Sequence, residues 1–266
     1  MQQSVTGLYS SKHLLYILPV VLLLATCSDR VTSPPADESD TGDPAGGSGN
    51  REVVGYSAGD LLSDARYEKL IVQVQYMAGA EPTQAALEGL LEFLEQHVYK
   101  ASIEIRKDQI EARGKETYSL AEIRALEDEN RIEYNRHDTI AAYYLYLDGG
   151  YQGDDDNSFV LGIAFRNTSM ALFQQNIESV SGGLGRPSQT TVETTVLNHE
   201  FGHILGLVGI GYETGHKDEE HGNHCDNEQC LLYYTATTDA IASLIGSSVP
   251  DLGENCLRDL RAKGGK

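Results

Sequence analysis

The chain has 266 residues, with 20 Lys and Arg against 40 Asp and Glu, so its formal net charge is −20 and its pI is near 4.6. This negative field repels phosphate backbones and anionic membrane surfaces, which argues against a nucleic-acid partner. Four cysteines exclude a small, disulfide-dense scaffold. The length and an apolar fraction of 40% suit one or two globular domains.

A short apolar run, LLYILPVVLLLA at residues 14–25, follows Lys12. A helix needs about 20 apolar residues to span a bilayer, so this run is typical of a signal peptide. It ends in Leu-Ala-Thr-Cys at Cys27, which resembles a bacterial lipobox, although Thr26 departs from the small residue usual there. The resemblance implies a lipoprotein signal peptide at 1–26 and a lipid on Cys27. Plain secretion and an uncleaved anchor are the alternatives.

Residues 27–52 are rich in Ser, Asp, Pro and Gly. Such a segment buries too little apolar surface to offset its ordering entropy, so we expect a disordered tether. The protein is then exported and anchored to a bacterial membrane, facing the periplasm or the cell surface. Its contact with the membrane is expected only through the lipid.

The remainder, residues 53–266, is expected to be a single catalytic domain. Alternating apolar residues predict strands at 69–77 and 102–110, and apolar runs predict strands at 140–147 and 159–165. Leucines at helical spacing predict a helix opened by Pro82. Further helices are predicted at 120–132, 187–207, 239–244 and 251–262. Strands that alternate with helices predict a small α/β sheet domain.

The predicted helix at 187–207 contains the sequence His-Glu-Phe-Gly-His, from His199 to His203. Residues four apart lie on the same face of a helix, so both imidazoles can bind one metal ion. Glu200 is turned about 100° away and can reach a water beside the metal without binding the ion itself. This spacing is typical of zinc hydrolases, in which the carboxylate acts as a general base.

A Gly at position 206 makes the segment resemble the metzincin clan of zinc proteases, whose pattern is HExxHxxGxx followed by His or Asp. Here that last position is Gly209, which has no ligating side chain. The later histidines are His216, His221 and His224.

His224 begins the sequence HCDNEQCLL, which resembles the archaemetzincin pattern of a third His, then Cys, four residues, Cys, one residue and Met. Leu232 stands at the Met position, and residues 209–223 form an insertion. The resemblance implies an α/β (α+β) zincin fold. Its parts are a twisted mixed sheet, an active-site helix with HExxH and a smaller C-terminal helical subdomain. It also implies His199, His203 and His224 as zinc ligands.

Several site assignments stay open. His221 or His216 is the alternative third ligand, and an acidic ligand is a further one, from Glu219, Glu220 or Glu228. The resemblance implies that a Tyr after the Leu232 turn stabilises the oxyanion, and Tyr233 and Tyr234 are the candidates. Core packing explains these two residues equally well.

Three cysteines, Cys225, Cys230 and Cys256, follow the candidates for the third histidine ligand, and they allow two interpretations. A disulfide between Cys225 and Cys230 is favoured in an exported protein, with Cys256 left over. The archaemetzincin resemblance instead implies a second, structural zinc. Its fourth cysteine is replaced by Gly253, so Asp251 or Glu254 would have to complete that site.

Two loop features remain. The acidic stretch at 154–157 is a calcium candidate without EF-hand spacing, and a solvated loop is favoured. Residues 159–173 are expected to supply an edge strand that binds an extended peptide.

Together these features predict a zinc-dependent metalloendopeptidase that acts on protein or peptide substrates as a monomer, with Glu200 as the general base. The alternatives are a zinc amide hydrolase acting on cell-wall peptides and a non-catalytic zinc-binding surface lipoprotein.

Overall fold

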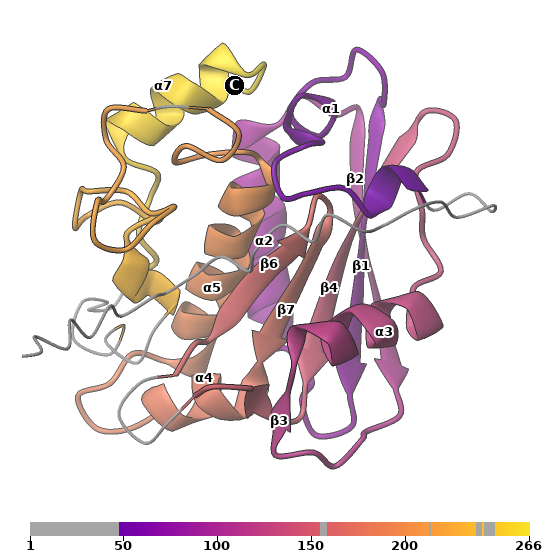
Figure 1. Ribbon diagram of the computed structural model, residues 1–266, viewed down its shortest axis with the longest axis vertical. Helices are drawn as coiled ribbons and strands as arrows, with labels where there is room; N and C mark the ends of the chain where they lie inside the picture. Colours follow the sequence, from indigo (N-terminus) through magenta and orange to yellow (C-terminus); the bar gives the residue numbers. More distant parts are fainter. Residues whose placement is uncertain (1–47, 155–158, 213, 238–240, 242–247) are drawn as a thin grey trace, which may run out of the picture. The chain divides into compact units, whose positions relative to one another are not determined.

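The computed structural model describes residues 48–154, 159–212, 214–237, 241 and 248–266, which all belong to one compact unit (Figure 1). Its centre is a five-stranded sheet with the order β2-β1-β4-β7-β6, in which only β6 runs antiparallel to its neighbour. These strands are β1 (Lys69–Met77), β2 (Ser102–Ile110), β4 (Thr139–Leu147), β6 (Gly162–Arg166) and β7 (Ser169–Phe173). A small parallel pair is formed by β3 (Thr117–Tyr118) and β5 (Gly150–Tyr151). The predicted mixed α/β architecture is confirmed.

Both faces of the sheet are covered, as expected for a mostly parallel sheet. Every residue of β4 is buried, and its neighbouring tyrosines point in opposite directions. Tyr143 donates to Gln75, whose amide reaches the carbonyl of Asn130, while Tyr144 donates to the carbonyl of Leu197. The helices that contain Asn130 and Leu197 therefore lie on opposite faces of the sheet, as Figure 1 shows.

The helices and 3₁₀ turns follow in chain order. They are η1 (Ser48–Asn50), α1 (Ala58–Leu62), α2 (Gln84–His97), α3 (Leu120–Asn130), α4 (Gln174–Val180), α5 (Gln189–Ile204), η2 (Tyr234–Thr237) and α7 (Glu254–Ala262). The predicted strands at 69–77 and 102–110 are confirmed with these bounds. Pro82 lies just outside α2, because the side chain of Thr83 caps that helix.

Several predicted elements have different bounds. The helix predicted at 187–207 is α5, Gln189–Ile204, and the strand predicted at 140–147 begins at Thr139. The helix predicted at 120–132 ends at Asn130, because Arg131 turns inward and pairs with Glu127 in the core. The strand predicted at 159–165 begins at Gly162 and is followed by a second strand, β7. The helix predicted at 251–262 begins at Glu254.

The folded part begins earlier than residue 53. Asn50 is buried, and its side-chain amide donates to Asn135, to the carbonyl of Ala141 and to Thr168. A disordered tether through residue 52 is therefore wrong at its C-terminal end, because these contacts fix the chain at Asn50. The predicted signal peptide and most of the tether, together with Cys27, lie outside the described residues.

The part of the chain after α5 is mostly loop, with η2 and α7 as its described helical elements. The helix predicted at 239–244 lies outside the described residues, except for Ile241. Within the described ranges, no helix has the length and apolar character needed to span a membrane.

Candidate metal centre

Helix α5 carries the HExxH sequence and has a defined signal at each end. The hydroxyl of Ser188 accepts from the amide of Thr191 at its start. At its end, Gly206 adopts a φ of +70°, and its amide and that of Leu207 bond back to the carbonyls of His203 and Gly202. This is a Schellman motif, which turns the chain away immediately after the second histidine.

The first two candidate ligands meet on one face of α5, as predicted. The Nε2 atoms of His199 and His203 are 3.0 Å apart. The Nδ1 of His199 lies 2.8 Å from the carbonyl oxygen of Leu231, which can only accept a hydrogen bond. The proton of this imidazole is therefore on Nδ1, and the lone pair of Nε2 faces His203.

The structure brings His224 to this pair. Its ring centroid lies 5.2 Å from each of the other two rings. Ligand atoms of the three imidazoles lie within 4.8 Å of one another. The Nδ1 of His224 contacts the carbonyl of His221 at 2.7 Å, which directs its Nε2 away from that carbonyl. Three converging imidazoles match the protein ligands of a catalytic zinc site, in which water or substrate takes the fourth position.

The alternative third ligands are engaged elsewhere. His216 bonds to Asp259 at 2.8 Å, and His221 bonds to Asp218 at 2.8 Å. The acidic alternatives are all exposed: Glu219, Glu220 and Glu228. None of these five side chains belongs to the His199 cluster among the described residues.

Burial keeps the three imidazoles neutral. It lowers the pKa of His199 to about 3, with a further contribution from His224. It also holds the pKa of His203 well below its usual value and lowers that of His224. Because a neutral imidazole offers a lone pair, the cluster is available to a cation across the neutral pH range. The buried Nδ1 of His203 has no hydrogen-bond partner in the structure.

Glu200 lies between α5 and the edge strand β6. Its side chain is 2% exposed, and burial raises its pKa to about 8 against the opposing effect of a hydrogen bond from the amide of Ala164. A Cβ atom on Gly162 would lie 3.0 Å from Cγ of Glu200 and 2.7 Å from Val196. Glycine at position 162 therefore allows β6 to approach the carboxylate closely.

Leu232 lies under the two helix histidines. A Cβ atom on Gly202 would meet the Cδ2 of Leu232 at 2.7 Å, and Leu232 is fully buried. An apolar residue thus supports the helix between His199 and His203, at the position where the archaemetzincin pattern has Met.

The two tyrosine candidates lie next in the chain, and both are partly exposed. The ring of Tyr234 stacks on that of His221 with centroids 3.5 Å apart, and Tyr233 packs against Tyr234 at 4.8 Å. Tyr234 therefore packs on the residue whose carbonyl orients His224. The role of the Tyr233 or Tyr234 hydroxyl in stabilising an oxyanion stays a prediction.

The three cysteines form a second buried cluster. All of them are free thiols, so the expected Cys225–Cys230 disulfide is not formed. The sulfur of Cys256 is instead 3.6 Å from that of Cys230. The suggested acidic partners Asp251 and Glu254 are exposed, whereas His216 approaches Cys225.

The calcium candidate is described only at its first residue. Asp154 accepts hydrogen bonds from the amides of Tyr151 and Val160 and from the side chain of Asn176. These donors hold the loop together, and calcium binding there stays a prediction. The other residues of the acidic stretch lie outside the described part of the chain.

Several groups that shape the site could not be recognised from a pattern in the sequence. The carbonyls of Leu231 and His221 orient two imidazoles, but a backbone acceptor is the same in every residue type. Gly162 matters only because of the strand that lies beside α5. Asp259 contacts His216 across 43 positions of the sequence.

No protein-family model and no curated protein sequence matches this chain. Among solved structures it is similar to the archaemetzincin from Methanopyrus kandleri, with 15% identity and a TM-score of 0.43 over 74% of this chain and 95% of that one. It is similar to a zinc-dependent peptidase from Methanocorpusculum labreanum, with 14% identity and a TM-score of 0.45 over 71% and 99% of the two chains. It is also similar to metalloproteinase-II from Bacteroides fragilis, with 12% identity and a TM-score of 0.43. That match covers 76% of this chain and 55% of the other.

An archaemetzincin, from the family that residues 199–232 resemble, is thus among the solved structures similar to this chain. The candidate metal centre consists of imidazoles and a carboxylate of this chain.

Proposed function

We propose that this protein is a zinc-dependent metalloendopeptidase. The observation that carries the proposal is the convergence of three buried, neutral imidazoles beside one buried carboxylate that belongs to none of the ion pairs of the described residues. His199, His203 and His224 would hold the zinc ion. When bound, zinc would supply Lewis acidity toward the carbonyl of a peptide bond.

Glu200 is the proposed general base and acid. It accepts a proton from the attacking water and passes it to the leaving nitrogen. Its raised pKa, about 8 in the metal-free protein, lies near neutral pH, where a proton-transfer group works best. A purely structural zinc site has no use for such a carboxylate, so Glu200 separates an enzyme from a zinc-binding lipoprotein.

Strand β6 is the proposed platform for the substrate. It lies at the edge of the described sheet and pairs with β7 on its inner side. An extended peptide can add to such an edge through main-chain hydrogen bonds. Because Ala164 of this strand also contacts Glu200, a peptide aligned on β6 passes beside the carboxylate.

The test compares the wild type with Glu200→Gln for zinc content and for hydrolysis of a mixed peptide library. Both proteins are expected to bind zinc, and only the wild type to cleave peptides, with a loss of at least about 10³-fold in the variant, since the general base is removed. Equal activity of the two proteins, or a wild type without zinc under zinc-replete conditions, would contradict the proposal. Cleavage of cell-wall peptides alone would favour the amide-hydrolase alternative.

The third ligand has its own prediction. We expect His224→Ala to reduce the affinity for the catalytic zinc by at least about 10²-fold, because one of three protein ligands is lost. His221→Ala is the matched control, since it keeps the main-chain carbonyl that orients His224. Measurement of zinc affinity by competition with a chromogenic chelator distinguishes them, and equal affinities would remove His224 from the site.

The lipid anchor is part of the proposed cellular context. We expect metabolic labelling with a fatty acid to mark the wild type in a bacterial host, and Cys27→Ala to abolish the label, because the thiol is the acylated group. Persistent labelling of the variant would place the lipid elsewhere.

A further inference from the structure

A second set of metal-ligand side chains lies in the part of the chain that follows α5. It consists of His216, Cys225, Cys230 and Cys256, and all four are buried, with at most 3% of the residue exposed. Ligand atoms of His216, Cys225 and Cys256 lie within 4.8 Å of one another. Nothing in the proposed peptidase chemistry uses these groups.

Two of the separations within this set match the edges of a zinc tetrahedron. The sulfur of Cys225 is 3.6 Å from Nδ1 of His216, and the sulfurs of Cys230 and Cys256 are also 3.6 Å apart. With Zn–S bonds of about 2.3 Å and Zn–N bonds of about 2.0–2.1 Å, neighbouring ligands of a tetrahedral zinc are about 3.4–3.8 Å apart. Three thiols and one imidazole form the donor set of a closed, structural zinc site.

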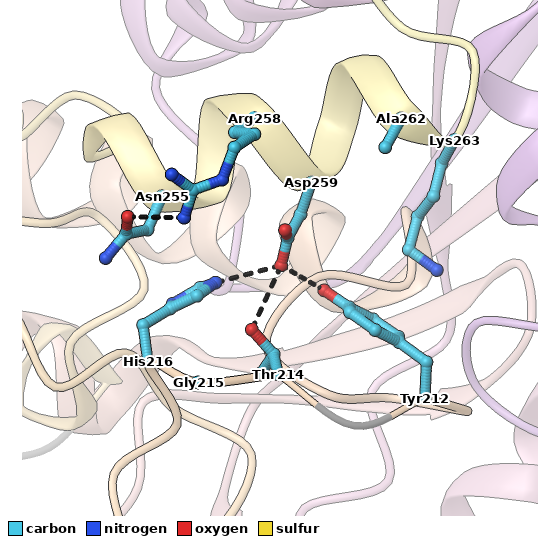
Figure 2. Close-up of a pocket in the computed structure, with 9 residues that line it drawn as sticks. All are labelled: Tyr212, Thr214, Gly215, His216, Asn255, Arg258, Asp259, Ala262 and Lys263. Atoms are coloured by element: carbon cyan, nitrogen blue, oxygen red, sulfur yellow. Dashed lines mark hydrogen bonds and ion pairs between the residues drawn. The ribbon is translucent and has the colours of Figure 1, made fainter.

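The imidazole of His216 is oriented toward the cysteines by a carboxylate that is not part of the cluster. Its Nε2 lies 2.8 Å from Oδ2 of Asp259 on α7, which also accepts from the hydroxyls of Tyr212 and Thr214 (Figure 2). A carboxylate on one imidazole nitrogen places the proton there and leaves the other nitrogen as a lone-pair donor. The free nitrogen, Nδ1, is the one that faces Cys225.

The backbone around Cys230 favours a thiolate. The amides of Leu232 and Gly253 point to its sulfur at 3.4 and 3.2 Å. Hydrogen bonds to the charged form stabilise a thiolate, which is the form that binds metal. Three buried thiols that served only as small apolar side chains would need neither these donors nor an oriented imidazole.

The archaemetzincin resemblance implies a structural zinc at the three cysteines and leaves its fourth ligand open. We propose that His216, held by Asp259, is that ligand, so that His216, Cys225, Cys230 and Cys256 form a Cys₃His site. Neither Asp251 nor Glu254 takes part, because the insertion at 209–223 supplies the fourth ligand. The site is separate from the proposed catalytic centre and stands without it.

Such a site would link three segments of the chain, one of which borders the proposed catalytic cluster. Cys225 directly follows His224, and Cys230 directly precedes Leu231, whose carbonyl orients His199. Cys256 lies in α7, and His216 lies in the insertion. A metal ion here fixes the segment that carries the third catalytic ligand.

The experiment loads the reduced full chain with Co²⁺ or Zn²⁺ and measures metal per chain and the thiolate-to-Co²⁺ charge-transfer absorption. The wild type is expected to bind two ions with a strong thiolate band. His203→Ala is expected to keep one ion and the full band, because only the imidazole site is damaged. One ion per wild-type chain and no thiolate band, or a Cys230–Cys256 disulfide that persists under reducing conditions, would overturn the proposal.

The fourth ligand is tested by substitution at position 216. His216→Ala is expected to weaken the thiolate-linked ion at least 10-fold, and Asp259→Asn to weaken it about 10- to 100-fold. His221→Ala, in the same loop and also paired with an Asp, is the control and should leave the band unchanged. His216→Cys is expected to restore binding with a stronger band, which a residue needed only for folding would not do. An unchanged band in His216→Ala, or no added intensity in His216→Cys, would exclude His216 as a ligand.

Discussion

At the scale of single residues, the candidate metal centre depends on which nitrogen of each imidazole is free. Two of the three rings are oriented by main-chain carbonyls, at Leu231 and His221. Side-chain substitution cannot remove those acceptors, so the orientation survives most mutations of the surrounding loop. The carboxylate of Glu200 differs, because burial is the largest influence on its pKa.

A pH-dependent stability of the metal-free protein follows from Glu200. Burial raises its pKa from 4.5 to about 8, so in this interval the folded protein keeps a proton that the unfolded chain has lost. The stability from this group is complete below about pH 4.5 and is lost as the pH rises toward 8. Glu200→Gln, which stays neutral, is expected to be more stable than the wild type at pH 8 by up to roughly 4 kcal/mol.

Urea unfolding of both metal-free proteins between pH 5 and 8 checks this expectation. The lowered pKa values of the imidazoles act in the opposite direction, but they are common to both proteins and cancel in the difference. A difference that stays constant with pH would show that Glu200 does not titrate in this range.

At the scale of elements, the decisive contact is that between β6 and α5. β6 is the one antiparallel strand of the five-stranded sheet, and it lies beside the helix that carries Glu200. The approach is close because Gly162 has no side chain. The same contact puts the proposed peptide platform and the proposed general base side by side.

Gly162→Ala should therefore impair catalysis more than zinc binding. The added methyl group would overlap Val196 and press on Glu200, so we expect at least a 10-fold loss of kcat/KM with unchanged zinc content. A destabilisation of about 1–3 kcal/mol is expected from overpacking. Peptidase assays and zinc analysis of the purified variant measure both effects.

Gly59→Ala is the matched control for that substitution. Gly59 lies in α1, and an added Cβ there meets open space. It should leave activity unchanged and be neutral or slightly stabilising. Full activity in Gly162→Ala would mean that β6 can move away from Glu200 without cost.

At the scale of the whole molecule, the described chain is held together by contacts between distant segments. Asn50, at the start of the described chain, bonds to Asn135, Ala141 and Thr168 near the centre of the fold. At the other end, α7 supplies both Cys256 and Asp259 to the second cluster. The insertion and the C-terminal helix therefore depend on each other for their positions.

The position of the N-terminal boundary can be measured. A chain that begins at residue 53 loses the buried side chain of Asn50 and the hydrogen bonds that it donates to Asn135, Ala141 and Thr168. We expect it to be less stable than a chain that begins at residue 48 by about 2–4 kcal/mol. Equal urea midpoints for the two chains would place the boundary at residue 53 after all.

The sequence by itself determined the features that repeat over a few residues. Alternation located β1 and β2 residue by residue, and the four-residue spacing of His199 and His203 put two imidazoles on one helix face. The same geometry turned Glu200 about 100° away from His199 on the helix. These inferences succeed because local backbone geometry alone sets which side chains share a face.

Only the tertiary structure decided which distant groups meet. Three later histidines had a comparable spacing to the motif, and packing brought His224 to His199 and His203 and brought His216 to the thiols. The disulfide expected between Cys225 and Cys230 failed for the same reason, since the spacing of two cysteines does not set the direction of their side chains. The physical cause is that such contacts join segments that are far apart in the sequence. A local repeat of apolar and polar residues does not determine where the end of a loop packs against the core.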